Sequence, residues 1–187
     1  MARCGSRSPR SREGRCSKRP SSSVTVRPRS STRTGRATCT RRSRLAAHRA
    51  VVDVDVELGL VKVVQIATAQ DVGRALNPLS VIGQIEGGIA QGLGLALMEE
   101  IVCQDGHVRN ASFTDYLLPT TLDMPDVVAT LIEQPDPQAP LGAKGVGEPP
   151  CISSTPAIVA AIRDALRQAG VERNLHRVPV RPADIVG

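Results

Sequence analysis

The chain has 187 residues and a formal net charge of +6, and this charge is divided unevenly along the sequence. Residues 1–50 contain fifteen Lys and Arg and one acid (+14), whereas residues 51–187 contain nine bases and seventeen acids (−8), and the two sum to +6. No apolar run approaches the ~20 residues of a membrane-spanning helix. Composition therefore argues against a membrane protein, and we expect one cytoplasmic domain preceded by a basic tail.

Residues 1–45 are predicted to form a disordered tail rich in Arg and Ser. Large apolar residues are almost absent from them, so this segment cannot bury enough surface to offset the entropy of ordering. Three origins remain open: a nucleic-acid-binding arm, a transit peptide, or out-of-frame translation of a GC-rich gene. The first lacks aromatic residues and the second lacks an amphipathic face. We favour the third and do not expect nucleic-acid binding.

Residues 46–187 form the predicted domain, which begins with two strands. Val52, Val54 and Val56 alternate with acidic residues, a pattern typical of a half-buried strand. Leu58-Gly59 then indicates a turn, and a second strand rich in Val and Ile runs over residues 60–68. The pair predicts an antiparallel hairpin.

A helix is predicted from Leu79 to about Ile101, opened by Asn77-Pro78, because apolar residues recur there at helical spacing. Five glycines interrupt it: Gly83, Gly87, Gly88, Gly92 and Gly94. Each costs about 1 kcal/mol relative to Ala inside a helix. We therefore expect a close neighbour, which is either a tightly crossing helix or a bulky ligand against the N-terminal half.

The remaining elements are further strands and one more helix. We expect a turn at Asp105-Gly106, strands over residues 108–118 and 127–132, and a loop over residues 134–150. A helix over residues 155–169 follows, with Ser154 or Thr155 as its cap, Pro156 in its first turn and Gly170 as its end. The predicted fold class is α+β.

The loop LGAKGVGEPP, residues 141–150, carries the candidate site. Glu148 stands between Gly147 and Pro149, and the proline favours an extended backbone at Glu148. Such a loop can present one carboxylate and several backbone N–H groups to a single ligand, although a solvated carboxylate in a turn is the plain alternative. Sequence motifs for a nucleophilic serine, a phosphate loop or a zinc protease are absent. Nothing pairs His48, His107 or His176 with a nucleophile, so we interpret them as surface or core residues.

Four segments in one order resemble the second molybdopterin-binding domain of the xanthine dehydrogenase and aldehyde oxidase family. They are NPLSVIGQIEGGIAQGLGLALMEE at residues 77–100, FTDYLLPTTLDMP at residues 113–125, GAKGVGEPP at residues 142–150 and RVPVRPADI at residues 177–185. The resemblance covers residues 46–187. It implies that this α+β domain is the C-terminal part of a molybdopterin-binding domain.

The resemblance also implies roles for individual residues. Glu148 matches the family's general base, which takes a proton from the water-derived hydroxide that attacks an electron-poor ring carbon. Gln84 matches a glutamine that hydrogen-bonds the pterin, and Lys144, Gly145, Val146 and Gly147 match the loop that lines it. The implied cofactor is molybdenum-molybdopterin, with a dinucleotide form as one option. Because the pterin sulfurs hold molybdenum in this family, no protein metal ligand is expected.

The same resemblance implies partners that the chain lacks. The remaining molybdopterin-binding region, a 2Fe-2S cluster and FAD are expected on other domains or subunits, so the isolated chain is predicted to be inactive. A purine, hypoxanthine or xanthine, is the expected substrate. Two alternatives stay open: an aldehyde oxidase-type enzyme, and a non-catalytic truncated remnant.

Overall fold

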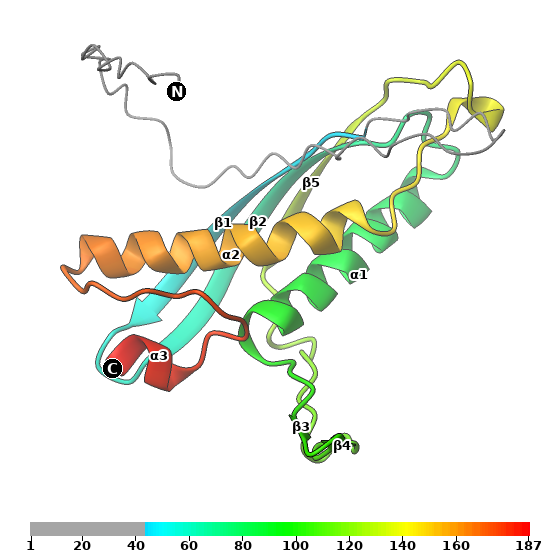
Figure 1. Cartoon of the computed structure of the whole chain (residues 1–187). Helices are drawn as coiled ribbons and strands as arrows, with labels where there is room; N and C mark the ends of the chain where they lie inside the picture. The colour runs from blue at the N-terminus through cyan, green and yellow to red at the C-terminus, as the bar shows by residue number, and fades with distance from the viewer. Residues whose placement is uncertain (1–43) are drawn as a thin grey trace, which may run out of the picture.

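The computed structural model describes residues 44–187, in which a three-stranded sheet is covered on one face by two long helices (Figure 1). The strands are β1 (Ala46–Asp55), β2 (Leu60–Asp71) and β5 (Asp126–Ile132), in the order β1-β2-β5. β1 and β2 pair antiparallel, which confirms the predicted hairpin, and β5 pairs parallel to β2. The predicted tail lies almost entirely outside the described residues, and both the tail and its boundary at residue 45 stay predictions.

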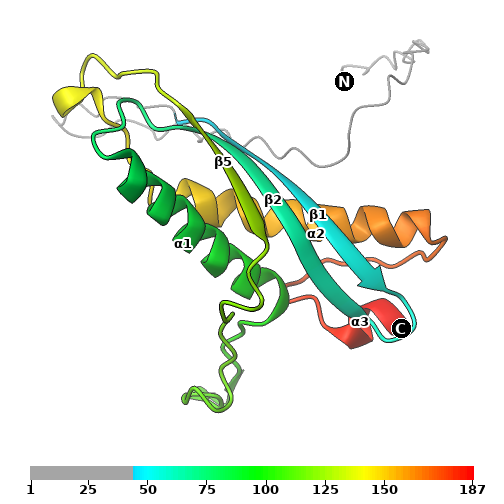
Figure 2. The same ribbon diagram turned by 180° about the vertical axis from the view of Figure 1, so that it is seen from behind.

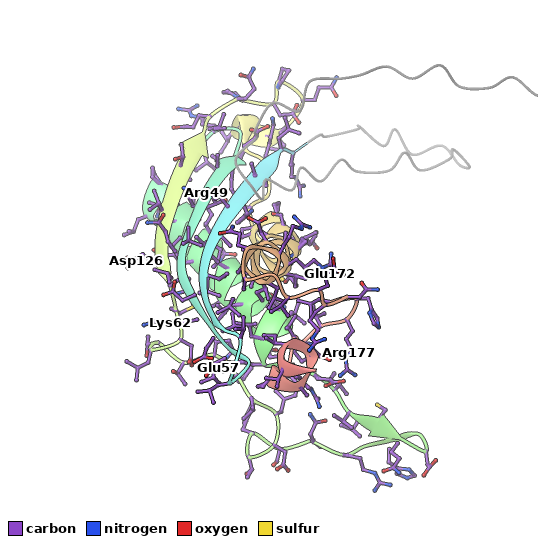
Figure 3. The ribbon with its side chains drawn as sticks, turned by 90° about the vertical axis from the view of Figure 1, so that its left-hand side faces the viewer. Arg49, Glu57, Lys62, Asp126, Glu172 and Arg177 are labelled. Atoms are coloured by element: carbon purple, nitrogen blue, oxygen red, sulfur yellow. The ribbon has the colours of Figure 1, made fainter. Side chains whose placement is uncertain are left out.

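Helices α1 (Pro78–Leu97) and α2 (Pro149–Gln168) both pack on the inner face of the sheet, as Figure 2 shows from the opposite side. The core between these layers is aliphatic, with Ile66, Ile89 and Ile162 fully buried. The outer face of the sheet carries polar side chains together with exposed apolar ones such as Val128. In Figure 3, Lys62 and Asp126 point away from the helices, and both are exposed.

Helix α1 begins where the sequence predicts and ends earlier. The side chain of Asn77 accepts a hydrogen bond from the Ser80 amide at 3.1 Å, and Pro78 occupies the first helical position. The last helical residue is Leu97, whereas the prediction extended to Ile101. Ile101 is 66 % exposed, so its apolar spacing with the helix was coincidental.

The segment that joins α1 to β5 differs most from the prediction. The turn at Asp105-Gly106 is confirmed, and it connects β3 (Cys103–Gln104) to β4 (His107–Val108), a short hairpin that projects away from the sheet (Figure 1). The strand predicted over residues 108–118 is wrong, because it ends at Val108 and the chain beyond it is irregular. No neighbouring strand pairs with this part of the described chain, and Phe113 is 83 % exposed.

Helix α2 begins six residues before the predicted start at Thr155. Ser154 and Thr155 are therefore not caps, and Pro156 lies inside the helix instead of in its first turn. The end of α2 just before Gly170 is confirmed, and the helix buries an apolar stripe. Ile158, Val159, Ile162 and Leu166 are buried, while Ala165 is half-buried.

Three shorter features complete the fold. A 3₁₀ turn, η1 (Pro140–Gly142), precedes the candidate loop, and α3 (Pro182–Val186) packs beside the β1–β2 turn, where Gly59 meets the Pro182 backbone. The Val178-Pro179 peptide bond is cis. Within residues 44–187 no helix combines the length and apolarity needed to cross a membrane.

Candidate functional site

The loop that carries the candidate residues is attached to the end of β2 by backbone and side-chain bonds. The Lys144 amide donates to the Val72 carbonyl at 3.0 Å. The Lys144 ammonium lies 2.5 Å from a carboxylate oxygen of Asp71, and each side chain is only 10 % exposed. The other oxygen of Asp71 accepts from the Gly73 amide at 3.1 Å. Lys144 therefore uses its charge to hold the loop, which leaves the loop backbone as the part that can contact a ligand.

Gly73 is required for this attachment. Its φ of +67° lies in the left-handed region, and a Cβ there would come within 2.4 Å of the Gly142 carbonyl oxygen. The same close approach allows Arg74 to donate its amide to that oxygen at 2.9 Å. The loop is thus fixed at its origin by contacts that only glycine permits.

Glu148 is the N-cap residue of α2, and its backbone is helical, with φ −87° and ψ −39°. The expectation of an extended backbone was wrong. Its carbonyl accepts hydrogen bonds from the Cys151 and Ile152 amides, both at 3.1 Å, and these bonds offset the conformational preference that Pro149 imposes.

The two prolines after Glu148 change what its carboxylate can do. An N-cap side chain normally accepts from the amide two or three residues later. Pro150 has no N–H, and the Cys151 N–H is directed to the Glu148 carbonyl, so the Glu148 side chain makes no capping bond. The carboxylate is exposed and forms no ion pair or hydrogen bond with the described residues. It is therefore available to a ligand.

Four of the five glycines of α1 fall into two kinds of surroundings. Gly88 and Gly92 face α2: a Cβ on Gly88 would lie 2.6 Å from the Pro150 Cβ, and one on Gly92 would lie 3.1 Å from the Cys151 carbonyl oxygen. The tightly crossing helix thus accounts for this half of α1. Gly83 and Gly87 are exposed, and a Cβ added to either would meet nothing within 4 Å. A ligand against the N-terminal half remains an expectation for these two.

Gln84 lies beside the loop. Its side-chain oxygen is 3.7 Å from the position that a Cβ on Gly147 would occupy. Gln84 precedes Gly88 by one helical turn, and Glu148 precedes Pro150 by two residues, so both lie just beyond the α1–α2 contact at the same end. The structure therefore brings Gln84 together with the loop at residues 144–148.

Unused backbone donors line this end of the molecule. No hydrogen bond joins the amides of Gly145, Val146 and Gly147 to other residues in the described range. The guanidinium of Arg44 covers Gly145, 3.2 Å from a Cβ position there. Amide donors, a glutamine, a guanidinium and a free carboxylate can together bind a polar, partly anionic ligand and accept a proton from it.

Sequence reasoning missed Asp71 and left the place of His48 open. His48 is 1 % exposed, and burial lowers its pKa from 6.5 to about 4. His48 was expected to be either a surface or a core residue, and the structure places it in the core. The strand pattern could have shown this, because His48 shares an alternate face with Ala50, which is also buried. No comparable signal links Asp71 to Lys144 across 73 positions.

Side chains of the described residues offer no ready metal site. Within residues 44–187 no group of three or more His, Cys, Asp or Glu side chains is placed to hold a metal ion. Cys103 is exposed and Cys151 is half-buried, and both are free thiols.

Comparison with known proteins identifies the family. The family model of the molybdopterin cofactor-binding domain matches residues 15–125, more than half of the chain. The xanthine dehydrogenase molybdenum-binding subunit of Escherichia coli O157:H7 is 40 % identical over 136 residues, which cover 70 % of this chain and 17 % of that protein.

Two solved structures agree with the sequence relatives. Quinoline 2-oxidoreductase from Pseudomonas putida 86 superposes with a TM-score of 0.72 at 39 % identity, covering 76 % of this chain and 18 % of that one. Aldehyde oxidoreductase from Desulfovibrio gigas superposes with a TM-score of 0.68 at 32 % identity, covering 77 % and 15 %.

The fold is therefore that of a molybdopterin-binding domain. The chain belongs to the molybdenum hydroxylase family, as part of a molybdopterin-binding subunit. It spans less than a fifth of the length of these relatives.

Proposed function

We propose that the chain forms one wall of the molybdenum-cofactor site of a hydroxylase, in which Glu148 is the general base. The observation that carries the proposal is the state of the Glu148 carboxylate. Pro150 lacks the N–H that a cap at Glu148 would use, and the carboxylate stays exposed at the end of α1 that carries Gln84. A carboxylate there has no structural task among the described residues, so it is free to accept a proton from a ligand within hydrogen-bond reach.

The described residues fit a pterin cofactor. Gly83 and Gly87 leave the helix backbone open to a flat neighbour, and the unused amides of residues 145–147 can donate to its ring carbonyl or phosphate oxygens. Gln84 can both donate and accept, as a pterin edge demands. The bound cofactor would supply two-electron oxidation and the transfer of a water-derived oxygen.

Glu148 would take the proton released from that water as its oxygen is transferred to the substrate carbon. Removing the proton makes the oxygen a stronger nucleophile. Glu148 would therefore accelerate the chemical step more than substrate binding.

Other protein must complete the site. Large apolar side chains that no described residue covers include Phe113, 83 % exposed, and Leu122, 94 % exposed. Exposed apolar patches mark contact surfaces. We propose that the rest of the molybdopterin-binding region, together with partners that carry 2Fe-2S and FAD, covers this surface, and that the isolated chain does not turn over.

A purine is the proposed substrate class. The names of two relatives specify xanthine and quinoline, and both are nitrogen heterocycles with an electron-poor carbon next to a ring nitrogen. An aldehyde is the second candidate, because the D. gigas relative is an aldehyde oxidoreductase. A hydrated aldehyde and a purine ring present different shapes, so turnover with each will separate them.

To test this, three forms of the chain are purified natively, each with and without the partner subunits: wild type, Glu148→Gln and Glu172→Gln. Glu172 is an exposed carboxylate beyond the opposite end of α2 and serves as the matched control. Molybdenum and pterin content are measured first, and then dye reduction with xanthine and with benzaldehyde.

We expect cofactor in all three complexes and turnover in all but Glu148→Gln, where kcat should fall by at least ~10²-fold. Turnover by Glu148→Gln at the control rate would show that another group is the base. A cofactor-free chain in every combination would contradict the cofactor site itself.

A further inference from the structure

A buried histidine is bonded to the same helical turn that begins at Glu148. His48 of β1 is 1 % exposed, and its Nδ1 lies 2.9 Å from the Ser153 hydroxyl oxygen. The Ser153 hydroxyl also lies 2.6 Å from the Pro149 carbonyl oxygen. Pro149 follows Glu148 directly, so a chain of two hydrogen bonds links the sheet to the residue next to the proposed base.

The direction of these bonds follows from the groups involved. A carbonyl oxygen can only accept, so the single hydroxyl hydrogen of Ser153 points to Pro149. The Ser153 oxygen is then the acceptor for His48, and Nδ1 must carry the imidazole hydrogen. Nε2 is left as a bare acceptor, which agrees with its lack of any partner within the described residues.

Burying an unpartnered ring nitrogen is costly, about 1–3 kcal/mol, so a phenylalanine or leucine here would fill the space at lower cost. His48 therefore needs a reason beyond packing. Its buried polar neighbours do not supply one: Thr68, opposite His48 on β2, accepts from the Gln70 side chain instead. The bond to Ser153 is the feature that an apolar residue could not reproduce.

We propose that His48 is a positioning residue, which fixes the first turn of α2 through Ser153 and thereby sets the orientation of Glu148. The second anchor of this turn is the contact of Pro150 with Gly88 on α1. One anchor comes from the sheet and the other from the neighbouring helix, so together they fix both the position and the rotation of the turn. The catalytic consequence rests on the proposed role of Glu148, whereas the hold on the backbone does not.

The first test needs no substitution. Nitrogen-15 NMR of the full chain at pH 7 distinguishes a hydrogen on Nδ1 of His48 from one on Nε2 by the shifts of the two ring nitrogens. We expect the Nδ1–H form. Observation of the Nε2–H form would overturn the inference, because His48 would then not donate to Ser153.

The second test measures the hold on Glu148 directly. The Cys151 and Ile152 amides donate to the Glu148 carbonyl, so their hydrogen exchange reports how firmly that residue is fixed. We expect exchange about tenfold faster in Ser153→Ala and His48→Leu. In His48→Asn the side-chain NH₂ replaces the Nδ1–H donor, so the two amides should exchange as slowly as in the wild type.

Ser154→Ala is the matched control, because Ser154 is equally buried on the same helix and, among the described residues, its hydroxyl bonds only the Cys151 carbonyl of its own turn. If amide exchange becomes faster to the same extent in Ser153→Ala and Ser154→Ala, then His48 contributes only general packing, and the proposal is overturned.

The third test uses the complex with its partner subunits. We expect kcat to fall about tenfold or more in Ser153→Ala and His48→Leu, with KM and molybdenum content unchanged and with recovery in His48→Asn. Unchanged kcat despite faster exchange would refute the catalytic part. If Glu148→Gln itself remains active, the proposed function fails, while the exchange data still decide whether His48 holds the turn.

Discussion

Two alanine substitutions on α1, Gly83→Ala and Gly88→Ala, should change stability in opposite directions. At Gly83 an added Cβ meets nothing within 4 Å, so Gly83→Ala gains the helix propensity of alanine, up to about 1 kcal/mol. At Gly88 the Cβ would lie 2.6 Å from the Pro150 Cβ, about 1 Å inside a normal carbon–carbon contact. Pro150 is a buried ring that cannot rotate away, so the helices must separate.

Overpacking of this kind costs about 1–3 kcal/mol, and the gain in propensity offsets part of it. We therefore expect Gly88→Ala to be less stable than Gly83→Ala by about 2 kcal/mol. Urea unfolding of the full chain, followed by circular dichroism, measures the difference, and Gly87→Ala is a second open control. Equal stabilisation by both substitutions would refute the assignment of Gly88 to a helix contact and of Gly83 to an open surface.

Three further predictions concern stability and pH. Lys144→Met should cost about 3 kcal/mol in urea unfolding because it leaves the Asp71 carboxylate buried without a counter-charge, and adding Asp71→Asn should recover part of the loss; a double variant no more stable than the single one would contradict this. Burial lowers the pKa of His48 from 6.5 to about 4. The contribution of the neutral imidazole to the free energy of unfolding is therefore full above pH 6.5 and is lost as the pH falls toward 4, about 3 kcal/mol in all. Wild type should therefore lose that much more stability than His48→Asn between pH 7 and pH 4, whereas His176→Asn, at an exposed histidine, should follow wild type. Arg44→Ala should leave unfolding unchanged and weaken pterin retention in the complex, because Arg44 covers Gly145 without supporting the core; a large loss of stability would argue for a structural role.

Local patterns in the sequence predicted the elements whose partners lie nearby in the chain. The β1–β2 hairpin followed from alternation in one strand and a turn at Leu58-Gly59, and the start of α1 followed from Asn77-Pro78. These signals depend on bonds within a few residues. The local sequence alone determines these features, so contacts with distant parts of the chain change them little.

The start of α2 could not be predicted in the same way. Pro156 resembled a first-turn proline, yet the helix runs through it and begins at Pro149. What favours the earlier start is burial of Pro150 against Gly88, a contact 62 positions apart in sequence. Burial of the apolar stripe along the whole helix offsets the local cost of the interior proline, which is of order 3 kcal/mol.

The candidate site shows the same division. Glu148 and its loop were selected from their glycines and prolines and then by resemblance, and Gln84 by resemblance alone. The structure brings them to one end of the α1–α2 pair. What resemblance did not supply is the support beneath them. The Asp71–Lys144 pair and the His48–Ser153 bond connect positions 73 and 105 residues apart, and no periodicity reveals such pairs.

The contacts that stabilise this fold are also those that place the proposed base. Pro149 and Pro150 begin α2 and at the same time remove a donor that would otherwise draw the Glu148 carboxylate into a cap. Gly88 admits Pro150, and β1 supplies the hydrogen bond that fixes the same turn. A substitution that loosens the α1–α2 crossing should therefore impair catalysis before it unfolds the chain, because Glu148 moves with the first turn of α2 while the rest of that helix stays packed on the sheet.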